Sequence, residues 1–369
     1  MRPPVPPRGG ALRVLAISNM YPRPEEPDYG TFVADMCDAL ERQGLALERA
    51  VIDTRAHGPL RTPAKYAGLL RRSASLARGC DVIYAHYLFP TGAVAATCGR
   101  LARRPWVITA HGRDVRNLGS DTLRRASAPA IGGAAALIAV SRFLAGELRA
   151  TGLRLPPVYV ASMGVDLERF HPADRAAARA RLRLRPAAPL ILAAGGLTER
   201  KNPLGLLQAL ALVRRELPDA RLALVGDGPL AGAVDAGVAR LGLDGAVHRT
   251  GPLPHADVAE WMAACDALAL PSHVEPLGIV ALEALASGRP VVATRVGGAA
   301  EVVGNAGVTV DPMSPRSIAD GLLRVLGDPP PPAACRRAAE AHGLDREAAR
   351  VAAVLQAAAA PPAPPTGAP

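Results

Sequence analysis

The chain has 369 residues, of which 49% are hydrophobic and only 3% aromatic, so Ala, Val, Leu and Ile must build the core of one large domain or two ordinary ones. A formal net charge of +10 favours an anionic partner, which leaves nucleic acid, a membrane surface and an acidic substrate open. No stretch approaches the roughly 18 uninterrupted apolar residues of a membrane span, which excludes a membrane-spanning protein.

The amino-terminal half alternates short apolar runs with helical patterns. Its first ten residues, MRPPVPPRGG, lack the apolar centre of a signal peptide, and we expect 1–10 to be a disordered tail. Several later runs are apolar throughout, as in a parallel sheet that helices cover on both faces. The strands expected here are Leu12–Ile17, Leu45–Ile52, Val82–Ala85, Trp106–Ala110 and Leu137–Val140.

The alternation pauses between His171 and Pro189 and then resumes. We therefore expect a first domain at 11–170, a linker at 171–188, a second domain at 189–328, and C-terminal helices with an Ala/Pro-rich tail at 329–369. The βαβα order predicts an α/β protein with two Rossmann-like, doubly wound domains. The strands expected in the second half are Leu190–Ala194, Arg221–Val225, Ala267–Leu270, Pro290–Ala293 and Gly307–Val310.

The five cysteines are odd in number and scattered, and no two form a C-x-x-C pair. This pattern is typical of reduced, buried thiols in a cytoplasmic protein. We expect no metal site from them.

One glycine-rich segment matches a dinucleotide-binding fingerprint. In RLALVGDGPLAGAV, Gly226-x-Gly228-x-x-Ala231 follows a strand. A nicotinamide site would need an acidic residue at the end of the next strand, and Ala246–Gly251 has none. The segment also does not lie on the first βα turn of its domain. A tight strand-to-helix turn, with Pro229 starting the helix, is favoured over a dehydrogenase.

Two carboxylates occupy an apolar segment. Ile279–Ala286 reads as a helix that is apolar on every side, yet it contains Glu283, and Glu275 precedes Pro276 just before it. A charged side chain is almost never buried without a partner, so Glu283 either pairs with an internal cation such as Arg289 or binds a ligand.

The start of this helix suits a phosphate, because its free N–H groups and positive dipole end lie just after Glu275. Glu283 then lies about 9 Å further along the axis. This layout fits a nucleoside diphosphate sugar, with one carboxylate for the sugar hydroxyls and the other for the ribose.

Glu275-x7-Glu283, with EALASGRPVVAT and GGAAEVV, resembles the signature of the retaining glycosyltransferase family four. Members of that family have the GT-B fold, with a donor cleft between two Rossmann-like domains. The resemblance runs from about Leu12 to Leu326 and is greatest to bacterial exopolysaccharide and cell-envelope transferases. Similar segments occur in the family's order: YPRPEEPDYGTFV, DVIYAHYLFPTG, WVITAHGRDV, AVSRFLAGEL, MGVDLERFHP, GGLTERKNP and VGDGPL.

The resemblance implies roles for the second domain. Glu275 would contact the donor sugar and Glu283 the ribose, while Lys201 would face the diphosphate. The backbone amides of Leu277, Gly278 and Ile279 would also meet the diphosphate. One position departs from the family, because Gly196 stands where an arginine is common, and Arg200 is the candidate replacement.

In the first domain, the resemblance implies that Gly30 lets the backbone approach the donor phosphate or the acceptor. His111 would contact the donor sugar near the reacting carbon. Asp114 would orient His111 or the acceptor, and His86 would line the cleft.

The implied activity is hexosyl transfer from a nucleotide-diphosphate sugar to an acceptor hydroxyl, with retention of the anomeric configuration. The acceptor expected is a lipid-linked or envelope/exopolysaccharide glycan. No cofactor is implied, and Lys201 with the helix start would replace a metal at the leaving diphosphate. A sugar-nucleotide 2-epimerase of the same fold and a catalytically idle sugar-nucleotide-binding protein are the alternatives. No nucleic-acid-binding motif accompanies the positive charge, so we expect no nucleic-acid partner.

A basic helix is predicted in RTPAKYAGLLRRSASLARGC. Its cations fall on one arc and its leucines on the other, which predicts peripheral binding to an anionic membrane surface on the cytoplasmic side. A solvated basic face is the alternative. The cations are Arg61, Lys65, Arg71, Arg72 and Arg78.

Overall fold

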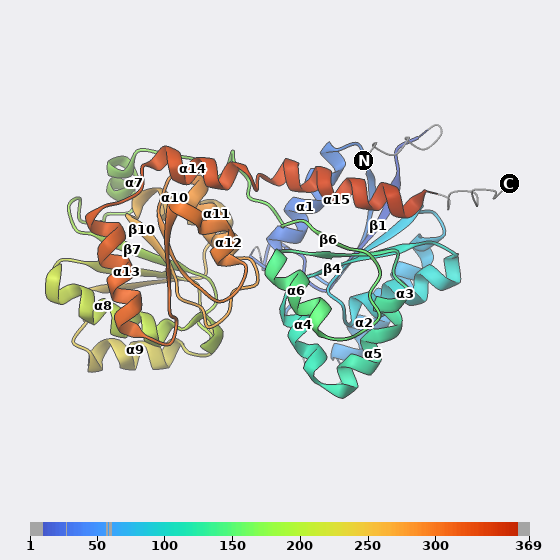
Figure 1. Ribbon diagram of the computed structural model, residues 1–369, viewed down its shortest axis with the longest axis horizontal. Coiled ribbons are helices and arrows are strands. Elements are labelled where there is room, and N and C mark those ends of the chain that lie inside the picture. The colour runs from blue at the N-terminus through green and yellow to red at the C-terminus, as the bar shows by residue number, and fades with distance from the viewer. Residues whose placement is uncertain (1–9, 27, 57, 59–60, 361–369) are drawn as a thin grey trace. The chain divides into compact units, whose positions relative to one another are not determined.

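A computed structural model of the protein describes residues 10–26, 28–56, 58 and 61–360. The chain forms two compact α/β units (Figure 1). The first contains the chain up to Met163 and the segment from Asp345 onward, and the second is Gly164–Leu344. Nearly all of the expected disordered tail, 1–9, and the Pro-rich end, 361–369, lie outside the described residues.

The first unit has a six-stranded parallel sheet in the order β2-β1-β3-β4-β5-β6. Its strands are β1 (Arg13–Ser18), β2 (Ala46–Val51), β3 (Val82–His86), β4 (Trp106–Ala110), β5 (Ala136–Ala139) and β6 (Val158–Val160). Its helical segments are α1 (Thr31–Arg42), α2 (Arg61–Ala77), α3 (Thr91–Ala102), α4 (Arg113–Arg116), η1 (Asn117–Gly119), α5 (Asp121–Gly132) and α6 (Arg142–Ala150). The carboxyl-terminal helix α15 (Leu344–Ala359) supplies the later part of this unit.

The second unit has another six-stranded parallel sheet, in the order β12-β11-β10-β7-β8-β9. Its strands are β7 (Leu190–Ala194), β8 (Arg221–Val225), β9 (Val247–Gly251), β10 (Ala267–Leu270), β11 (Val291–Thr294) and β12 (Gly307–Val310). Its helical segments are α7 (Arg175–Arg181), η2 (Glu199–Lys201), α8 (Pro203–Glu216), α9 (Ala231–Arg240), α10 (His255–Ala264), α11 (Ile279–Ala286), α12 (Ala299–Val303), η3 (Gly304–Ala306), α13 (Pro315–Gly327) and α14 (Pro332–Glu340).

Most strands form where apolar runs predict them, because the inner strands of each sheet are buried on both faces. β3, β4, β5 and β10 are buried at every position. One strand was not predicted: β6 is a three-residue edge strand, and its Tyr159 and Val160 stay 43% and 41% exposed. Its apolar run, Val158–Val160, is only three residues long, too short to stand out as a strand.

The segment expected to be a linker, 171–188, belongs to the second unit. Its helix α7 packs against α10, and Arg179 on α7 is only 2% exposed. The Arg179 guanidinium donates to the carbonyls of Ala264 and Ala188 and forms an ion pair with Asp266 at 2.6 Å. The units therefore divide at Met163/Gly164, because Arg179 fixes this segment to its own sheet. In the expected C-terminal region 329–369, α14 likewise lies in the second unit, and the chain returns to the first from Asp345.

We expect Arg179→Met to lower the free energy of unfolding of the second unit by about 3 kcal/mol, because it leaves buried carbonyls without a donor. The matched control is Arg181→Met, two residues along the same helix. Arg181 pairs with Glu260 but is 62% exposed in its side chain, so its loss should cost no more than about 0.5 kcal/mol. Urea unfolding of both variants measures the difference, and equal losses would contradict an anchoring role for Arg179.

Candidate functional site

Two loops at the carboxyl edge of the second sheet are tied together. One follows β7 and the other follows β10, and these strands are neighbours. Asn202, which caps α8 in a left-handed conformation, donates from Nδ2 to the carbonyls of Pro271 at 3.3 Å and Pro312 at 2.7 Å. The His273 amide donates to the Arg200 carbonyl at 2.8 Å. These contacts place Arg200 and Lys201 beside the loop that carries Glu275.

The backbone of Glu275 is clamped by the loop after β11. Its amide donates to the Val296 carbonyl at 3.1 Å, and the Gly298 amide donates to its carbonyl at 2.8 Å. Gly297, at φ +117°, approaches so closely that an added Cβ would lie 2.2 Å from the Glu275 carbonyl oxygen. Only glycine fits at position 297. The backbone of Glu275 is consequently held in place, which limits the positions that its side chain can take.

Three donors converge on one oxygen of Glu275. Lys201 Nζ lies 2.7 Å, Ser272 Oγ 3.0 Å and Arg200 Nη1 3.2 Å from Oε2. No described residue donates to Oε1. The Glu275 side chain is 8% exposed, so the charge of Lys201 meets little solvent screening.

This environment keeps Glu275 ionised. Burial alone raises the pKa of Glu275, but the charges of Lys201 and Arg200, with the hydrogen bonds from Lys201 and Ser272, bring that pKa below its usual value of 4.5. Arg200, the candidate replacement for the arginine missing at Gly196, therefore binds Glu275 directly.

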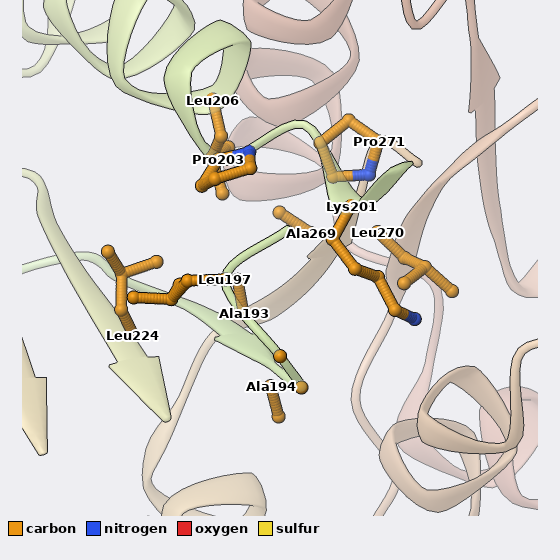
Figure 2. A pocket seen from close by; sticks show the side chains of 12 residues that line it. Ala193, Ala194, Leu197, Lys201, Pro203, Leu206, Leu224, Ala269, Leu270 and Pro271 are labelled. Carbon is orange, nitrogen blue, oxygen red and sulfur yellow. The ribbon is translucent and has the colours of Figure 1, made fainter. Parts of the chain in front are cut away.

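Lys201 also borders a small apolar pocket at the end of β7 and β10 (Figure 2). Its nitrogen points away from Pro203 and Leu206, while its stem lies near Leu270 and Pro271. The lining residues are Ala193, Ala194, Gly195, Gly196, Leu197, Lys201, Pro203, Leu206, Leu224, Ala269, Leu270 and Pro271. The ammonium group of Lys201 thus adds a charge to a pocket whose other lining residues are Ala, Gly, Leu and Pro.

The glycine-rich turn after β8 supports the loop after β7. An added Cβ would lie 2.3 Å from the Gly195 oxygen if placed on Gly226, and 2.5 Å from the Leu197 oxygen if placed on Gly228. The Leu197 amide donates to the Asp227 carbonyl at 3.0 Å. The glycines therefore serve backbone packing, which agrees with the interpretation as a tight turn. The helix itself starts later than predicted, at Ala231 rather than Pro229.

The start of α11 has backbone amides without a described acceptor. Gly278 precedes the helix in a left-handed conformation, at φ +82°, and no side chain caps it. The amides of Leu277, Gly278 and Ile279 donate to no described residue. The structure is thus compatible with the predicted diphosphate contact, which remains a prediction.

Glu283 lies one turn into α11 and pairs with a residue that the sequence did not indicate. His255, the first residue of α10, places Nε2 2.7 Å from Glu283 Oε1. The proposed alternative partner, Arg289, is wrong, since its guanidinium donates to the Ala263 carbonyl instead. His255 is 28 residues away, and nothing in the pattern PLPHADV beyond a helix start distinguishes it.

In the first unit, His86 and His111 form a buried pair. His86 Nδ1 and His111 Nε2 lie 3.2 Å apart, and the rings of Phe32 and Tyr87 also pack on His111. His86 is 0% exposed, so it does not line a cleft as expected but lies beneath His111. Burial lowers the pKa of His86 to about 3 and the pKa of His111 well below 6.5, so both rings are neutral at pH 7.

Asp114 orients the backbone around His111. Its Oδ1 accepts from the amides of His111, Gly112 and Val115 at 3.0, 2.8 and 3.1 Å, and its Oδ2 accepts from Leu88 at 3.0 Å. Burial raises the pKa of Asp114, and these four backbone hydrogen bonds oppose the rise. Asp114 therefore holds the loop that carries His111 and does not bond the ring itself.

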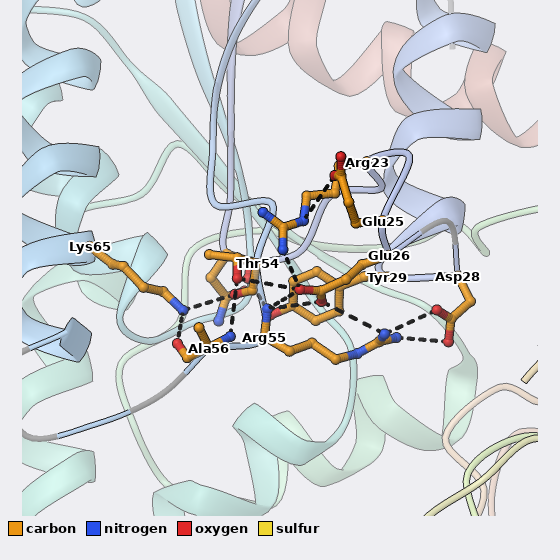
Figure 3. Close-up of polar contacts among 10 residues, drawn as sticks. Arg23, Glu25, Glu26, Asp28, Tyr29, Thr54, Arg55, Ala56 and Lys65 are labelled. Atoms are coloured by element: carbon orange, nitrogen blue, oxygen red, sulfur yellow. Dashed lines mark hydrogen bonds and ion pairs between the residues drawn. The ribbon is translucent and has the colours of Figure 1, made fainter.

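Gly30 caps α1 at φ +76°, where an added Cβ would lie 2.6 Å from the Met20 carbonyl carbon. A close approach of the chain to itself thus requires this glycine. The loop before it is held by Glu26, which accepts from Arg23, Thr54 and the Arg55 amide (Figure 3). The predicted role of Gly30 toward a ligand remains a prediction.

Within the part of the chain that the structure describes, no group of three or more His, Cys, Asp or Glu side chains is arranged to hold a metal ion. Among the same residues, no helix combines the length and the apolar character that crossing a bilayer needs.

Two family models match the chain. Residues 29–169 match the model described as Glycosyltransferase Family 4, and residues 174–342 match Glycosyl transferases group 1. A D-inositol 3-phosphate glycosyltransferase from Frankia alni is 37% identical over 286 residues, which cover 71% of this chain and 70% of that protein. The relative of the same name from Nocardioides is 40% identical over 188 residues, which cover 46% of this chain and 41% of that protein. The chain therefore spans less than half the length of some relatives that it matches.

Solved structures share the fold. Anabaena HepE in complex with UDP and glucose has a TM-score of 0.76 at 24% identity, and the match covers 94% of this chain and all of that one. WaaG, a glycosyltransferase involved in lipopolysaccharide biosynthesis, has a TM-score of 0.71 at 19% identity, covering 93% and 99%. At such identities the likeness shows the fold alone, and it confirms the predicted GT-B class of two Rossmann-like units.

We expect Glu275→Gln to destabilise the second unit by about 2 kcal/mol at pH 7, because it removes the charge that three donors hold. The folded pKa of Glu275 is depressed, so the stability from its ionised form is present above pH 4.5 and is lost as the pH falls through the folded pKa. The difference between wild type and Glu275→Gln should therefore shrink below pH 4.5. Chemical denaturation from pH 7 to pH 3 measures it, with exposed Glu216→Gln as control. A difference that stays constant over this range would be inconsistent with an ion pair.

Proposed function

The chain belongs to glycosyltransferase family 4, and on that premise we propose that it moves a hexosyl group from a nucleoside diphosphate sugar to an acceptor hydroxyl, with retention of the anomeric configuration. One observation carries the proposal. Lys201, Arg200 and Ser272 all bind Oε2 of a buried, ionised Glu275, at the loop that leads into α11. A buried carboxylate whose pKa is perturbed by specific charged partners is a recurrent feature of ligand sites, which supports a binding role for Glu275.

Each carboxylate has one oxygen for the donor. We assign Glu275 Oε1 to a hydroxyl of the transferred sugar, because Oε2 is already shared by three donors. Glu283 Oε2 is assigned to the ribose, because Oε1 binds His255. The neutral ring of His111 is the further proposed contact with the sugar. The two carboxylates lie on one short segment with the start of α11 between them, and this order matches that of a sugar, a diphosphate and a ribose.

The leaving diphosphate is stabilised by the Lys201 ammonium and by the amides at the start of α11. Both are fixed in place before any ligand binds, since Asn202 ties the loops together and Gly278 opens the helix. Preorganised donors of this kind stabilise developing charge without a metal. The proposed reaction therefore needs no cofactor.

Relatives support a class of donor and a class of acceptor. HepE, which shares the fold at 24% identity, was solved in complex with UDP and glucose, so UDP-sugars are the first donors to test. The relatives named D-inositol 3-phosphate glycosyltransferase support an acceptor that carries a phosphate, and a lipid-linked envelope glycan also carries phosphate. Either acceptor suits a chain with a net charge of +10.

The experiment is a comparison of nucleoside diphosphate release with and without acceptor. Thermal shift with UDP-, GDP- and ADP-sugars first identifies the donor that binds. A transferase should release the diphosphate slowly without acceptor, faster with acceptor, and equally well in EDTA. No release from a donor that binds would leave an idle binding protein, a free 2-epimer would indicate an epimerase, and loss in EDTA that magnesium or manganese restores would contradict the metal-free mechanism.

The two carboxylates should differ in kinetics. We expect Glu275→Gln to lower kcat about 100-fold, because the sugar is held through the reaction at this residue. Glu283→Ala should raise KM for the donor about 10-fold with a smaller effect on kcat, because the ribose does not react. Steady-state kinetics with varied donor separates them, with Glu216→Gln as control. Wild-type transfer by both variants at subsaturating donor would remove the assignment.

We also propose that the protein works in the cytoplasm and binds anionic membranes on their inner face through α2. The buried side of α2 is Leu69, Ser73 and Ala77, which leaves Arg71 and Arg72 exposed. Next to them, Leu70 is 37% exposed in a groove between α2 and α3. Basic side chains beside an apolar groove suit the headgroup region of a bilayer.

Lys65 does not belong to this basic surface, although its position in the sequence predicted that it would. Its ammonium donates to the carbonyl of Thr54 at 2.8 Å and also to that of Ala56 (Figure 3). It holds the loop after β2 and is not available to lipid.

We expect the chain to float with vesicles that contain anionic lipid, less so as salt rises, and to lose binding in Arg71→Glu/Arg72→Glu. Each cation near the surface contributes about 1 kcal/mol, so two reversals should weaken binding more than 10-fold. The matched control, Arg215→Glu/Arg240→Glu, makes the same charge change at exposed positions of the second unit. Equal recovery with neutral and anionic vesicles would end the proposal, as would equal loss in both double variants.

A further inference from the structure

Glu283 is the last member of a chain of three polar side chains within the second unit. Arg169 Nη1 lies 2.9 Å from His255 Nδ1, and His255 Nε2 lies 2.7 Å from Glu283 Oε1. Neither Arg169 nor His255 contacts the donor in the proposed function. The geometry of these two contacts decides which ring nitrogen of His255 carries the proton.

The guanidinium of Arg169 fixes the tautomer. Arginine stays charged and has only donors, so the nitrogen of His255 that faces Arg169 must accept. A doubly protonated ring would set N–H against N–H at 2.9 Å. His255 is therefore neutral, with its proton on Nε2, and that proton points to Glu283 Oε1.

Residues other than these three also hold Arg169 and the ring of His255. Asp166 Oδ1 accepts from the amides of Glu168 and Arg169, both at 3.0 Å, and its Oδ2 pairs with the Arg169 guanidinium at 3.3 Å. The ring of Phe170 packs on the His255 ring at a centroid distance of 5.1 Å. Since His255 also begins α10, its backbone and its ring are both fixed.

We propose that Arg169 and His255 are positioning residues that hold Glu283 by Oε1 and thereby present Oε2 to the ribose of the donor nucleotide. No described residue binds Oε2. Without the N–H of His255, the carboxylate can rotate about its last bond, and its two oxygens share the hydroxyls of the ligand less selectively. The inference rests on the proposed function only in naming the ribose as the occupant.

The first test reads the tautomer itself, without any activity. Two-bond ¹H–¹⁵N NMR at pH 7.5 should show His255 of the full chain as the neutral form with the proton on Nε2. In Arg169→Met a doubly protonated fraction should appear, because Nδ1 no longer faces a guanidinium while Glu283 still accepts from Nε2. A proton on Nδ1 in the wild type, or an unchanged spectrum in Arg169→Met, would overturn the proposed relay of contacts from Arg169 through His255 to Glu283, called the relay below.

The second test reads recognition of the ribose. UDP, GDP and ADP are compared by calorimetry, and the tightest is measured against its 2′-deoxy form. The wild type should prefer the ribose form about 10-fold, and His255→Leu should reduce this preference to about twofold. His255→Gln keeps an N–H donor toward Oε1 and should restore at least half of the preference. The exposed His171→Leu, outside the relay, should behave as wild type.

The outcomes separate the relay from the function. If Glu283→Ala abolishes the ribose preference while His255→Leu keeps it, the relay is wrong and the ribose assignment stands. If Glu283→Ala itself keeps both affinity and preference, Glu283 does not bind the ribose and that part of the proposed function fails. If His255→Leu unfolds, the NMR comparison of the wild type with Arg169→Met decides, and an unchanged spectrum there would overturn the relay.

Discussion

The buried ion pair between Lys201 and Glu275 is the interaction on which the site depends. Removing a carboxylate and an ammonium from water costs several kcal/mol each, and their attraction offsets this only if the geometry is good and the remaining polar atoms are bonded. The chain supplies that geometry through two backbone devices. Asn202 ties the lysine loop to Pro271, and Gly297 lets a third loop clamp the Glu275 backbone. The pair is thus the product of three loops at one edge of one sheet.

The two carboxylates share a design that explains their presence in an apolar segment. Each is about nine-tenths buried, and each has one oxygen engaged by the protein, by Lys201, Arg200 and Ser272 at Glu275 and by His255 at Glu283. A carboxylate that used both oxygens internally would be structural alone, and one that used neither would be too costly to bury. One engaged oxygen gives a fixed direction to the other, which is what recognition of sugar and ribose hydroxyls needs.

The sequence predicted the features that depend on local pattern. Apolar runs marked the strands because a strand buried on both faces has no polar position, and Glu275 and Glu283 stood out because a charge contradicts such a run. Pairings across the fold were not predictable: His255 reaches Glu283 from the start of another helix, and Lys65 binds the carbonyl of Thr54 instead of joining the basic face of α2. His86 looked like a ligand contact because it ends a strand at the functional edge, but it is fully buried and contacts His111. Such outcomes depend on which segments pack against a residue, and the spacing of residues in the sequence does not show that.

The most direct measurement is a crystal structure of the full chain with the nucleoside diphosphate sugar that binds it. The account predicts Glu275 Oε1 within hydrogen-bond distance of a sugar hydroxyl and Glu283 Oε2 within that distance of the ribose. Lys201 should keep its contact with Glu275, and His255 its contact with Glu283. A donor bound elsewhere, or one that takes Oε2 of Glu275 by displacing Lys201, would contradict it.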